Sequence, residues 1–234
     1  GRLGGAVSRE LGASGYRVGV LYHREREAAS ECVAAIDRQG GGAVMAALDL
    51  ADPGSMERCL REVEMAFGAP PALLVQCAGR FAPTPVEAEP EWEGIERLMR
   101  INLQGPLWLA LRVARTMNLG AGGQIILMGD IWGERPLRGH AAYSAAKAGL
   151  LMATRALAKD FAPRVRVNAI APGALLPPET PHGPSAEGYR QLLARTPLAE
   201  QAGPQAVLHA LRYLLDAPFV TGEILRVDGG RLLH

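Results

Sequence analysis

Short apolar runs alternate along the chain with longer segments in which apolar residues recur every three or four positions. A short run that is apolar throughout is typical of a buried strand, whereas the longer spacing is typical of a helix with one buried face. The runs predict strands at residues 17–22, 43–48, 72–76, 124–128, 165–170 and 224–227. The amphipathic segments predict helices at residues 4–14, 26–39, 53–67, 89–100, 103–117, 141–161 and 205–215.

Strands that are apolar on both faces and alternate with helices favour a parallel sheet covered on both sides. The sequence therefore predicts an α/β fold: a doubly wound parallel sheet in a three-layer αβα arrangement, with residues 1–234 as a single domain. The chain opens on a glycine turn and a helix. Because such a turn follows a central strand in a doubly wound sheet, we expect a first strand to precede Gly1.

One stretch late in the chain carries no periodic pattern. Residues 172–186 are rich in proline, which favours a loop over a helix or a strand. We expect a lid over the site, at about residues 172–202 and containing short helices.

Composition excludes several classes of protein. A net charge of +1, with scattered basic residues, argues against a nucleic-acid surface. No apolar run approaches the roughly 20 residues that span a bilayer, so we expect no membrane contact. Cys32, Cys59 and Cys77 form no Cys-x-x-Cys pair and the five histidines show no ligand spacing, so we expect no metal site. So few cysteines fit a reducing compartment, and we expect a cytoplasmic protein.

Asp130, Tyr143 and Lys147 form a candidate catalytic group. Tyr143 and Lys147 are four residues apart in a predicted helix and therefore share one face, while Asp130 follows a predicted strand. A carboxylate, a phenol and an ammonium in one place are suited to proton transfer, and we expect the ammonium to lower the pKa of the phenol. The alternative for Asp130 is a helix cap.

A second candidate site involves the glycine turn Gly1-x-x-Gly4-Gly5. Glycines let phosphates approach the free N–H groups at a helix N-terminus. Arg24 lies 20 residues past Gly4, at the end of the next predicted strand, where a basic side chain accommodates the 2′-phosphate of NADP. Arg2 adds positive charge to the turn. A closely packed turn and a solvated surface arginine are the alternatives.

Further motifs follow the other predicted strands: Gln76-Cys77-Ala78-Gly79, Asn102, Tyr143-x-x-x-Lys147, Pro172-Gly173 and Asp228-Gly229-Gly230. Together with the glycine turn, they resemble the short-chain dehydrogenase/reductase family over nearly the whole chain. The resemblance implies a Rossmann fold and an NAD(P)H-dependent oxidoreductase. It also implies assembly into tetramers or dimers, and we expect a homotetramer.

Within that family the chain is most similar to pteridine reductases and dihydromonapterin reductases. The similarity rests on Arg2-Leu3-Gly4, on Tyr22-His23-Arg24, on Phe81, and on Asp130 where most members have serine. It implies NADPH as the cofactor and a pterin or folate as the substrate, such as a dihydropteridine, dihydromonapterin or a dihydrofolate-like molecule.

The resemblance also implies a role for each matching residue. Those that would hold NADPH are Gly1, Arg2, Leu3, Gly4, His23, Arg24, Asp49, Leu50, Cys77, Ala78, Gly79, Tyr143, Lys147, Pro172 and Gly173. Those that would carry the catalysis are Asp130, Tyr143, Lys147 and Asn102, and those that would contact the substrate are Arg2, Phe81, Asp130 and Tyr143. Tyr143 is the expected proton donor. Asn102 is expected to support a water chain to Lys147 through its backbone.

Three alternatives remain open. One is a family member that acts on other carbonyl compounds, such as a 3-oxoacyl thioester reductase. Another is a non-catalytic NADP-sensing module, suggested by Gln76-Cys77 where the family usually has two asparagines. The third takes Ser144-x-x-Lys147 as an acyl-enzyme motif, although its companion motifs are absent.

Overall fold

The computed structural model describes residues 1–87, 89, 91–173 and 185–233. Its strands, in chain order, are β1 (Val18–Tyr22), β2 (Ala43–Ala47), β3 (Leu73–Gln76), β4 (Gly123–Met128), β5 (Val165–Pro172) and β6 (Ile224–Val227). Its α-helices are α1 (Arg2–Ala13), α2 (Arg26–Arg38), α3 (Pro53–Phe67), α4 (Trp92–Met99), α5 (Gly105–Leu119), α6 (Ala141–Phe161), α7 (Ala186–Ala194) and α8 (Gly203–Asp216). Shorter turns are a π-helix at Arg100–Gln104 and 3-10 helices at Ile131–Gly133 and Arg231–Leu233.

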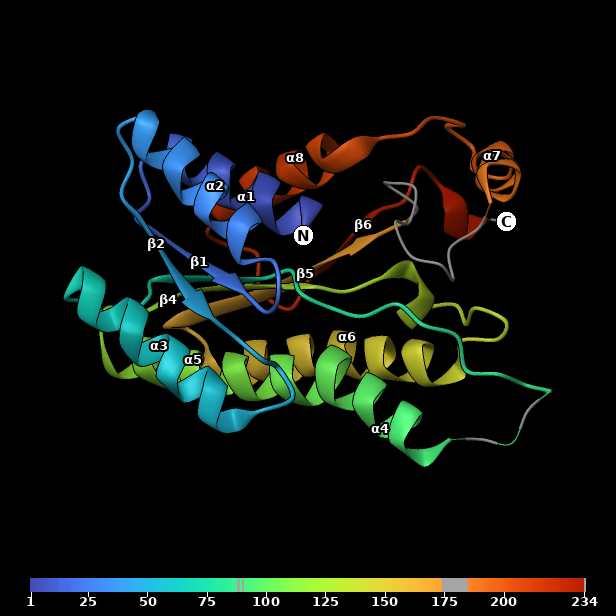
Figure 1. The fold of residues 1–234 in the computed structure, drawn as a ribbon, viewed down its shortest axis with the longest axis horizontal. Coiled ribbons are helices and arrows are strands. Elements are labelled where there is room, and N and C mark those ends of the chain that lie inside the picture. Colours follow the sequence, from blue (N-terminus) through green and yellow to red (C-terminus); the bar gives the residue numbers. More distant parts are fainter. Residues whose placement is uncertain (88, 90, 174–184, 234) are drawn as a thin grey trace.

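The elements form three layers, as predicted. Helices α1, α2 and α8 cover one face of the sheet, and α3, α5 and α6 cover the other (Figure 1). The strands between them are parallel, and β4 and β5 are buried along nearly their whole length; Ile125 and Ile126, adjacent on β4, face opposite helix layers. This is the α/β, Rossmann-like arrangement expected from strands without a polar face.

Most element ends agree with the sequence prediction, because local signals define them. Helix α3 begins at Pro53 after Asp52, whose carboxylate accepts a hydrogen bond of 2.8 Å from the Gly54 N–H. It ends at Gly68, whose φ of 65° a residue with a side chain rarely adopts.

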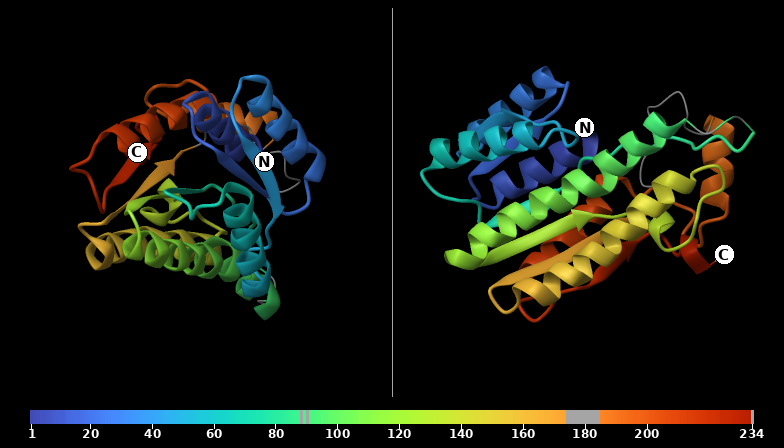
Figure 2. Two further views of the ribbon diagram at one scale, coloured as in Figure 1. Left: turned by 90° about the vertical axis from the view of Figure 1, so that its left-hand side faces the viewer. Right: turned by 90° about the horizontal axis from the view of Figure 1, so that it is seen from below.

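The sheet is divided into two parts. Strands β2 and β1 pair with each other, and β3, β4, β5 and β6 form a second set, with no pairing between β1 and β3 in the described chain. Figure 2 shows the two parts side by side between the helix layers. A cavity of about 1560 Å³ is lined by residues of both β1 and β3.

Two local features depart from the predicted helices. Between α4 and α5 the chain forms a π-helical turn that contains Asn102, which the sequence placed in an ordinary helix. Helix α7 is a short helix in the stretch where the sequence predicts a lid with short helices, although its bounds were not predicted. It begins after Ser185, whose hydroxyl accepts a hydrogen bond from the Gly188 N–H, and it lies within the predicted lid. Residues 174–184 of that predicted lid lie outside the described residues.

Candidate active site

The candidate residues gather at one end of the sheet because parallel strands all end there. Tyr22 ends β1, Gln76 ends β3, Met128 ends β4 and Pro172 ends β5, and the predicted site residues follow directly. Ligands of doubly wound sheets bind at this edge. The fold therefore brings together segments that lie more than 100 residues apart in the sequence.

Tyr143 and Asp130 are in direct contact. The Tyr143 hydroxyl donates a hydrogen bond of 2.6 Å to Oδ2 of Asp130. The other carboxylate oxygen, Oδ1, accepts from the Trp132 N–H at 2.9 Å and so caps the short helix that begins at Ile131. Asp130 therefore combines both roles considered from the sequence: it caps a helix and it contacts the phenol.

Lys147 lies one turn further along α6. Its ammonium donates a hydrogen bond of 2.8 Å to the Met128 carbonyl at the end of β4 and lies 5.9 Å from the centre of the Tyr143 ring. This bond fixes the lysine side chain across the strand end, beside the phenol, where only 5% of the lysine surface is exposed.

The pKa shifts in this group are dominated by burial. Burial raises the pKa of the Asp130 carboxyl, although the Trp132 N–H, the Tyr143 hydroxyl and the charge of Lys147 oppose the rise. Burial likewise lowers the pKa of Lys147, against the opposing charge of Asp130. Each shift disfavours the charged form of the group.

The expectation that Lys147 lowers the pKa of Tyr143 is wrong for this structure. Burial, together with the charge of Asp130 and the hydrogen bond to it, raises the pKa of Tyr143 well above its ordinary value. The nearest charged partner of the phenol oxygen is a carboxylate, whereas the ammonium is bound to Met128. Tyr143 therefore keeps its proton at neutral pH, which is the state required of a proton donor.

Asn102 holds the loop that follows β3. Its amide nitrogen donates to the Arg80 carbonyl at 2.9 Å and to the Leu98 carbonyl at 3.1 Å, and its oxygen accepts from the Arg80 N–H at 2.9 Å. A Cβ at Gly79 would lie 2.9 Å from the Asn102 oxygen and 3.7 Å from the Lys147 ammonium. The glycine thus leaves open space between these two side chains, beside the predicted cofactor path.

The start of α1 suits a phosphate group. No side chain caps this helix, and its first turn contains no acidic residue, so its free N–H groups and positive dipole end face the cavity. The cavity is lined by Gly1, Arg2, Leu3 and Gly4, as the sequence predicts for a dinucleotide site. These residues fit the phosphates of a nicotinamide dinucleotide.

The end of β1 provides the next part of the cavity. His23 and Arg24 both line it, and Nε2 of His23 lies 3.6 Å from Oδ2 of Asp49, which follows β2. Glu25 also lines it. The sequence analysis did not consider Glu25, whose negative charge lies next to the arginine expected to bind a 2′-phosphate.

Two of the residues predicted to bind the cofactor, Leu50 and Gly173, are also closely packed against other parts of the chain. Leu50 is buried in the core beneath the start of α5, so only its backbone remains for a ligand. Gly173 donates its N–H to the Val227 carbonyl at 2.9 Å, and a Cβ on it would lie 2.9 Å from the Cα of Asp228. Pro172 and Gly173 therefore join β5 to the end of β6.

The unusual pair Gln76-Cys77 lies in the wall of the cavity with Ala78 and Gly79. The Gln76 amide nitrogen donates to the Ala78 carbonyl at 2.7 Å, while its oxygen is buried and finds no partner in the described chain. Burial raises the pKa of the Cys77 thiol to about 12, so it stays neutral despite the nearby Lys147. An unpaired oxygen here suits a hydroxyl group of a bound ligand.

Of the predicted substrate residues, Phe81 contacts the phenol, whereas Arg2 is near a residue of α7. The Phe81 ring lies edge-to-face with Tyr143, at 5.0 Å between ring centres and 82°. Arg2, on α1, lies close enough to Tyr189 for its charge to act on the tyrosine, whose pKa burial raises and Arg2 partly lowers. Tyr189 belongs to α7 and is buried, so α7 packs toward the arginine side of the site.

His140 is the residue of this region that the sequence analysis missed. Its ring stacks on Phe81 at 4.5 Å between ring centres and 20° between planes. It precedes α6 and therefore lies one turn before Tyr143. Its position three residues before the tyrosine was the only available signal, and position alone does not identify a chemical role.

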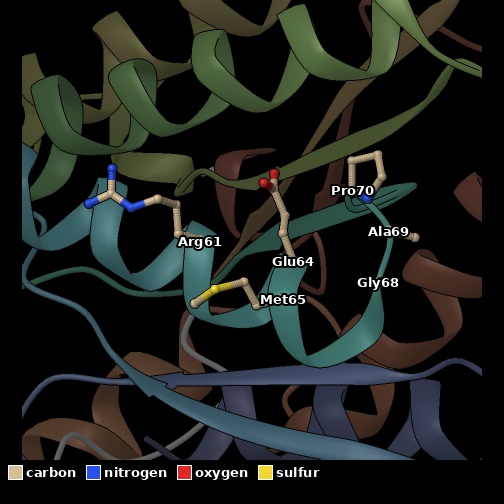
Figure 3. A pocket seen from close by; sticks show the side chains of 6 residues that line it. All are labelled: Arg61, Glu64, Met65, Gly68, Ala69 and Pro70. Atoms are coloured by element: carbon tan, nitrogen blue, oxygen red, sulfur yellow. The ribbon is translucent and has the colours of Figure 1, made fainter.

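Other features of the described residues do not add to this site. A cavity of about 330 Å³ at the end of α3 is lined by residues from Arg61 to Pro70 (Figure 3). It precedes β3, whereas the site follows that strand, so the two lie at opposite ends of the sheet. No group of three or more potential metal-binding side chains occurs in residues 1–87, 89, 91–173 and 185–233. Within the same residues, no helix is long and apolar enough to span a membrane.

Comparison with known proteins agrees with this geometry. A family model described as enoyl-(acyl carrier protein) reductase matches residues 3–231. A rat 3-oxoacyl-[acyl-carrier-protein] reductase is 32% identical over 229 residues, covering 97% of this chain and 92% of the relative. A 3beta-hydroxysteroid dehydrogenase of Eggerthella lenta is 32% identical over 241 residues, covering 99% and 90%. The crystal structure of a dehydrogenase/reductase from Sinorhizobium meliloti superimposes with a TM-score of 0.86 at 32% identity, covering 98% and 90%.

Fold, site and relatives together define a nicotinamide-dependent oxidoreductase. The chain belongs to the short-chain dehydrogenase/reductase family. Members of this family use NAD(H) or NADP(H), act on small molecules and are commonly homotetramers.

Proposed function

We propose that the protein is an NADPH-dependent reductase of a pterin, such as a dihydropteridine, dihydromonapterin or a dihydrofolate-like molecule. The observation that carries the proposal is the contact between Tyr143 and Asp130. The reaction is the reduction of a C=N bond in a flat heterocycle. NADPH supplies the hydride, which adds to the carbon, and the nitrogen takes a proton.

The hydrogen-bonding capacity of the site favours nitrogen as the reacting atom. A ketone oxygen has two lone pairs and is best oriented by two donors, whereas an imine nitrogen has one lone pair. Both oxygens of Asp130 act as acceptors, which leaves the Tyr143 hydroxyl as the donor of this pair. The carboxylate in turn suits the N–H and amino groups that border a pterin ring.

Proton transfer follows from the same contact. The raised pKa of Tyr143 keeps the phenol protonated until a basic nitrogen approaches. Once the phenol has donated its proton, the ammonium of Lys147 stabilises the negative charge that forms on Tyr143. We propose that Asp130 then connects the phenol to solvent protons, and that Asn102 maintains the loop and helix turn beside Lys147.

The walls of the site support a flat substrate. Phe81 lies edge-to-face with Tyr143, and we propose that the bound heterocycle packs against the Phe81 ring next to the phenol. We propose that Arg2 donates hydrogen bonds to the edge of the pterin. We also propose that NADPH binds along Gly1–Gly4 and Gln76–Gly79, with His23 and Arg24 at its 2′-phosphate.

Steady-state oxidation of NADPH tests the proposal, with dihydrobiopterin, dihydromonapterin, dihydrofolate and an acetoacetyl thioester compared under one condition. We expect kcat/KM for the best pterin to exceed that for the thioester by at least 100-fold, a difference of roughly 2.7 kcal/mol in transition-state stabilisation. Equal or higher activity with the thioester would reject the pterin assignment.

Reduction of 3-oxoacyl thioesters is the second candidate. The observation in its favour is that several relatives with about 30% identity are named 3-oxoacyl-[acyl-carrier-protein] reductases. Asp130 distinguishes the two candidates: for a thioester reductase, Asp130→Ser should raise kcat/KM with the acetoacetyl thioester, because a hydroxyl can donate to the ketone oxygen.

We also propose a cytoplasmic homotetramer. Cys32, Cys59 and Cys77 are all free thiols, which fits a reducing compartment. Large apolar side chains are exposed on two different faces: Leu111 of α5 with Met152 of α6, and Tyr213 of α8 with Phe219, which precedes β6. A tetramer with two-fold symmetries needs two such faces.

A further inference from the structure

One buried polar atom beside Tyr143 has no partner. Nε2 of His140 is buried and forms no hydrogen bond with any part of the chain that the structure describes. Nδ1 of the same ring lies 3.0 Å from the Arg138 carbonyl. A carbonyl only accepts, so Nδ1 carries a proton; in the tautomer with its single proton on Nδ1, Nε2 is a bare acceptor. A buried acceptor without a partner is unfavourable, so an unpaired Nε2 at this position indicates a partner that binds from outside the chain.

The imidazole is connected to the catalytic phenol through Phe81. Its ring stacks on Phe81, and Phe81 in turn lies edge-to-face with Tyr143. The three rings form a continuous series from the helix start to the phenol. An apolar ring at position 140 would stack on Phe81 equally well, so packing alone does not require a histidine there.

Two backbone contacts hold these rings in place. The Thr84 N–H donates to the Gly139 carbonyl at 2.6 Å, and the Ala142 N–H donates to the Thr84 hydroxyl at 3.1 Å. They fasten the loop that carries Phe81 to the first turn of α6, on both sides of His140. The position of the imidazole is therefore fixed before a ligand binds, as a recognition group requires.

We propose that His140 is a specificity-determining residue whose Nε2 accepts a hydrogen bond from an N–H or O–H group of the substrate, next to the bond that is reduced. This inference rests on the proposed function and deepens it. A dihydropterin carries N–H groups around its ring and satisfies the acceptor. A 3-oxoacyl thioester presents carbonyl oxygens, which also only accept and would leave Nε2 unpaired.

The test compares His140→Phe, which keeps a stacking ring, with His140→Gln, which keeps a hydrogen-bonding group. His209→Phe, on the exposed side of α8, makes the same exchange away from the site and serves as the matched control. KM and kcat are measured with a dihydropterin and with its N-methylated analogues, alongside the Kd of NADPH and the Tm.

We expect His140→Phe to raise KM for the dihydropterin about tenfold, the effect of one lost hydrogen bond, with the Kd of NADPH unchanged. His140→Gln should restore KM to within about threefold. One N-methylated analogue should bind the parent enzyme and His140→Phe equally well. The inference is overturned if His140→Phe changes KM no more than His209→Phe does, or equally for every analogue.

A failure of the proposed function has a different signature. If the parent enzyme reduces only thioesters, the pterin assignment falls, and the role of His140 is judged on the thioester pair. A 3-hydroxyacyl thioester has the O–H donor that its 3-oxo counterpart lacks. His140→Phe should then weaken binding of the hydroxy compound about tenfold and leave that of the oxo compound unchanged; an equal effect on both would reject the inference.

Discussion

Tyr143 lies between two groups of opposite charge, and the structure shows which one controls its ionisation. The carboxylate of Asp130 accepts a hydrogen bond of 2.6 Å from the phenol, while the ammonium of Lys147 donates one to the Met128 carbonyl. The phenol therefore remains protonated until a basic group of a substrate is presented to it. Asp130 holds the phenol proton in a hydrogen bond, and Lys147 is placed to stabilise the negative charge that remains after the proton is donated.

Replacing the phenol tests its role directly. Tyr143→Phe should reduce kcat by at least 1,000-fold, because the ring stays in place and the transferable proton is lost. The Kd of NADPH, measured by fluorescence titration, should change less than threefold. Retention of a tenth of the parent kcat would show that another group donates the proton.

Removing the neighbouring charge tests the origin of the pKa shift. Asp130→Asn eliminates the carboxylate that raises the pKa of Tyr143, so that pKa should fall although it stays above its ordinary value because of burial. Absorbance at 295 nm, with Tyr143→Phe as the reference, follows this ionisation. An unchanged titration would show that burial alone causes the shift.

The same shift affects stability in alkaline solution. The folded pKa of Tyr143 lies above the value of about 10 expected for the unfolded chain, so the folded state binds the extra proton above pH 10. The free energy of unfolding should therefore fall as pH rises above 10. In Tyr143→Phe, denaturant titrations between pH 9 and 11 should show a smaller fall.

At the scale of residues, the sequence predicts identities better than interactions. Spacing placed Tyr143 and Lys147 on one helix face, and the structure places Asp130 beside them. Whether the pKa of the Tyr143 phenol is raised or lowered depends on which side chain contacts its oxygen. The spacing of residues in the sequence does not give that contact. For His140, the stack on Phe81 depends on a loop 59 residues earlier in the chain.

At the scale of elements, the ends of the strands matter most. β1, β3, β4 and β5 each end in a segment that contributes to the site, so the short turns after them determine what binds. Helix α3 was predicted to the residue because Asp52 and Gly68 mark its ends. The bounds of α7 were not predicted, because the proline-rich stretch before it carries no periodic pattern; only the presence of short helices was expected there.

The end of β1 provides the test of cofactor choice. Arg24→Ala should reduce the preference for NADPH over NADH about tenfold, through loss of a charge-assisted hydrogen bond to the 2′-phosphate. Arg61→Ala on α3, which lines the other cavity, removes the same charge from the opposite end of the sheet and should leave the ratio unchanged. An unaltered ratio in Arg24→Ala would remove the basis for assigning NADPH, and Glu25 would then be the residue to examine.

At the scale of the whole molecule, the alternation of strands and helices was sufficient to predict the layered fold. It could not predict the π-helical turn at Arg100–Gln104, because a turn of five residues is too short to show a periodic pattern of its own. That turn brings Asn102 to the backbone of Arg80 and so links α4 and α5 to the loop after β3.

The division of the sheet has a consequence for how a dinucleotide affects this molecule. The proposed binding residues belong to both parts: His23 and Arg24 follow β1, whereas Cys77 and Gly79 follow β3. A ligand long enough to contact all four residues would connect the two sets of strands across the cavity. At 100 times its Kd, NADPH should stabilise the bridged form by about 2.7 kcal/mol.

Hydrogen–deuterium exchange can measure whether ligand binding connects the two sets of strands. The amides of β1 and β2 should exchange up to about 100-fold more slowly with NADPH at that concentration. Adenosine 2′,5′-bisphosphate, which lacks the nicotinamide half, should protect the β1 side without linking it to β3. If both ligands protect the two sets of strands equally, the two sets already move together without the dinucleotide. Binding of NADPH then adds no further connection between them.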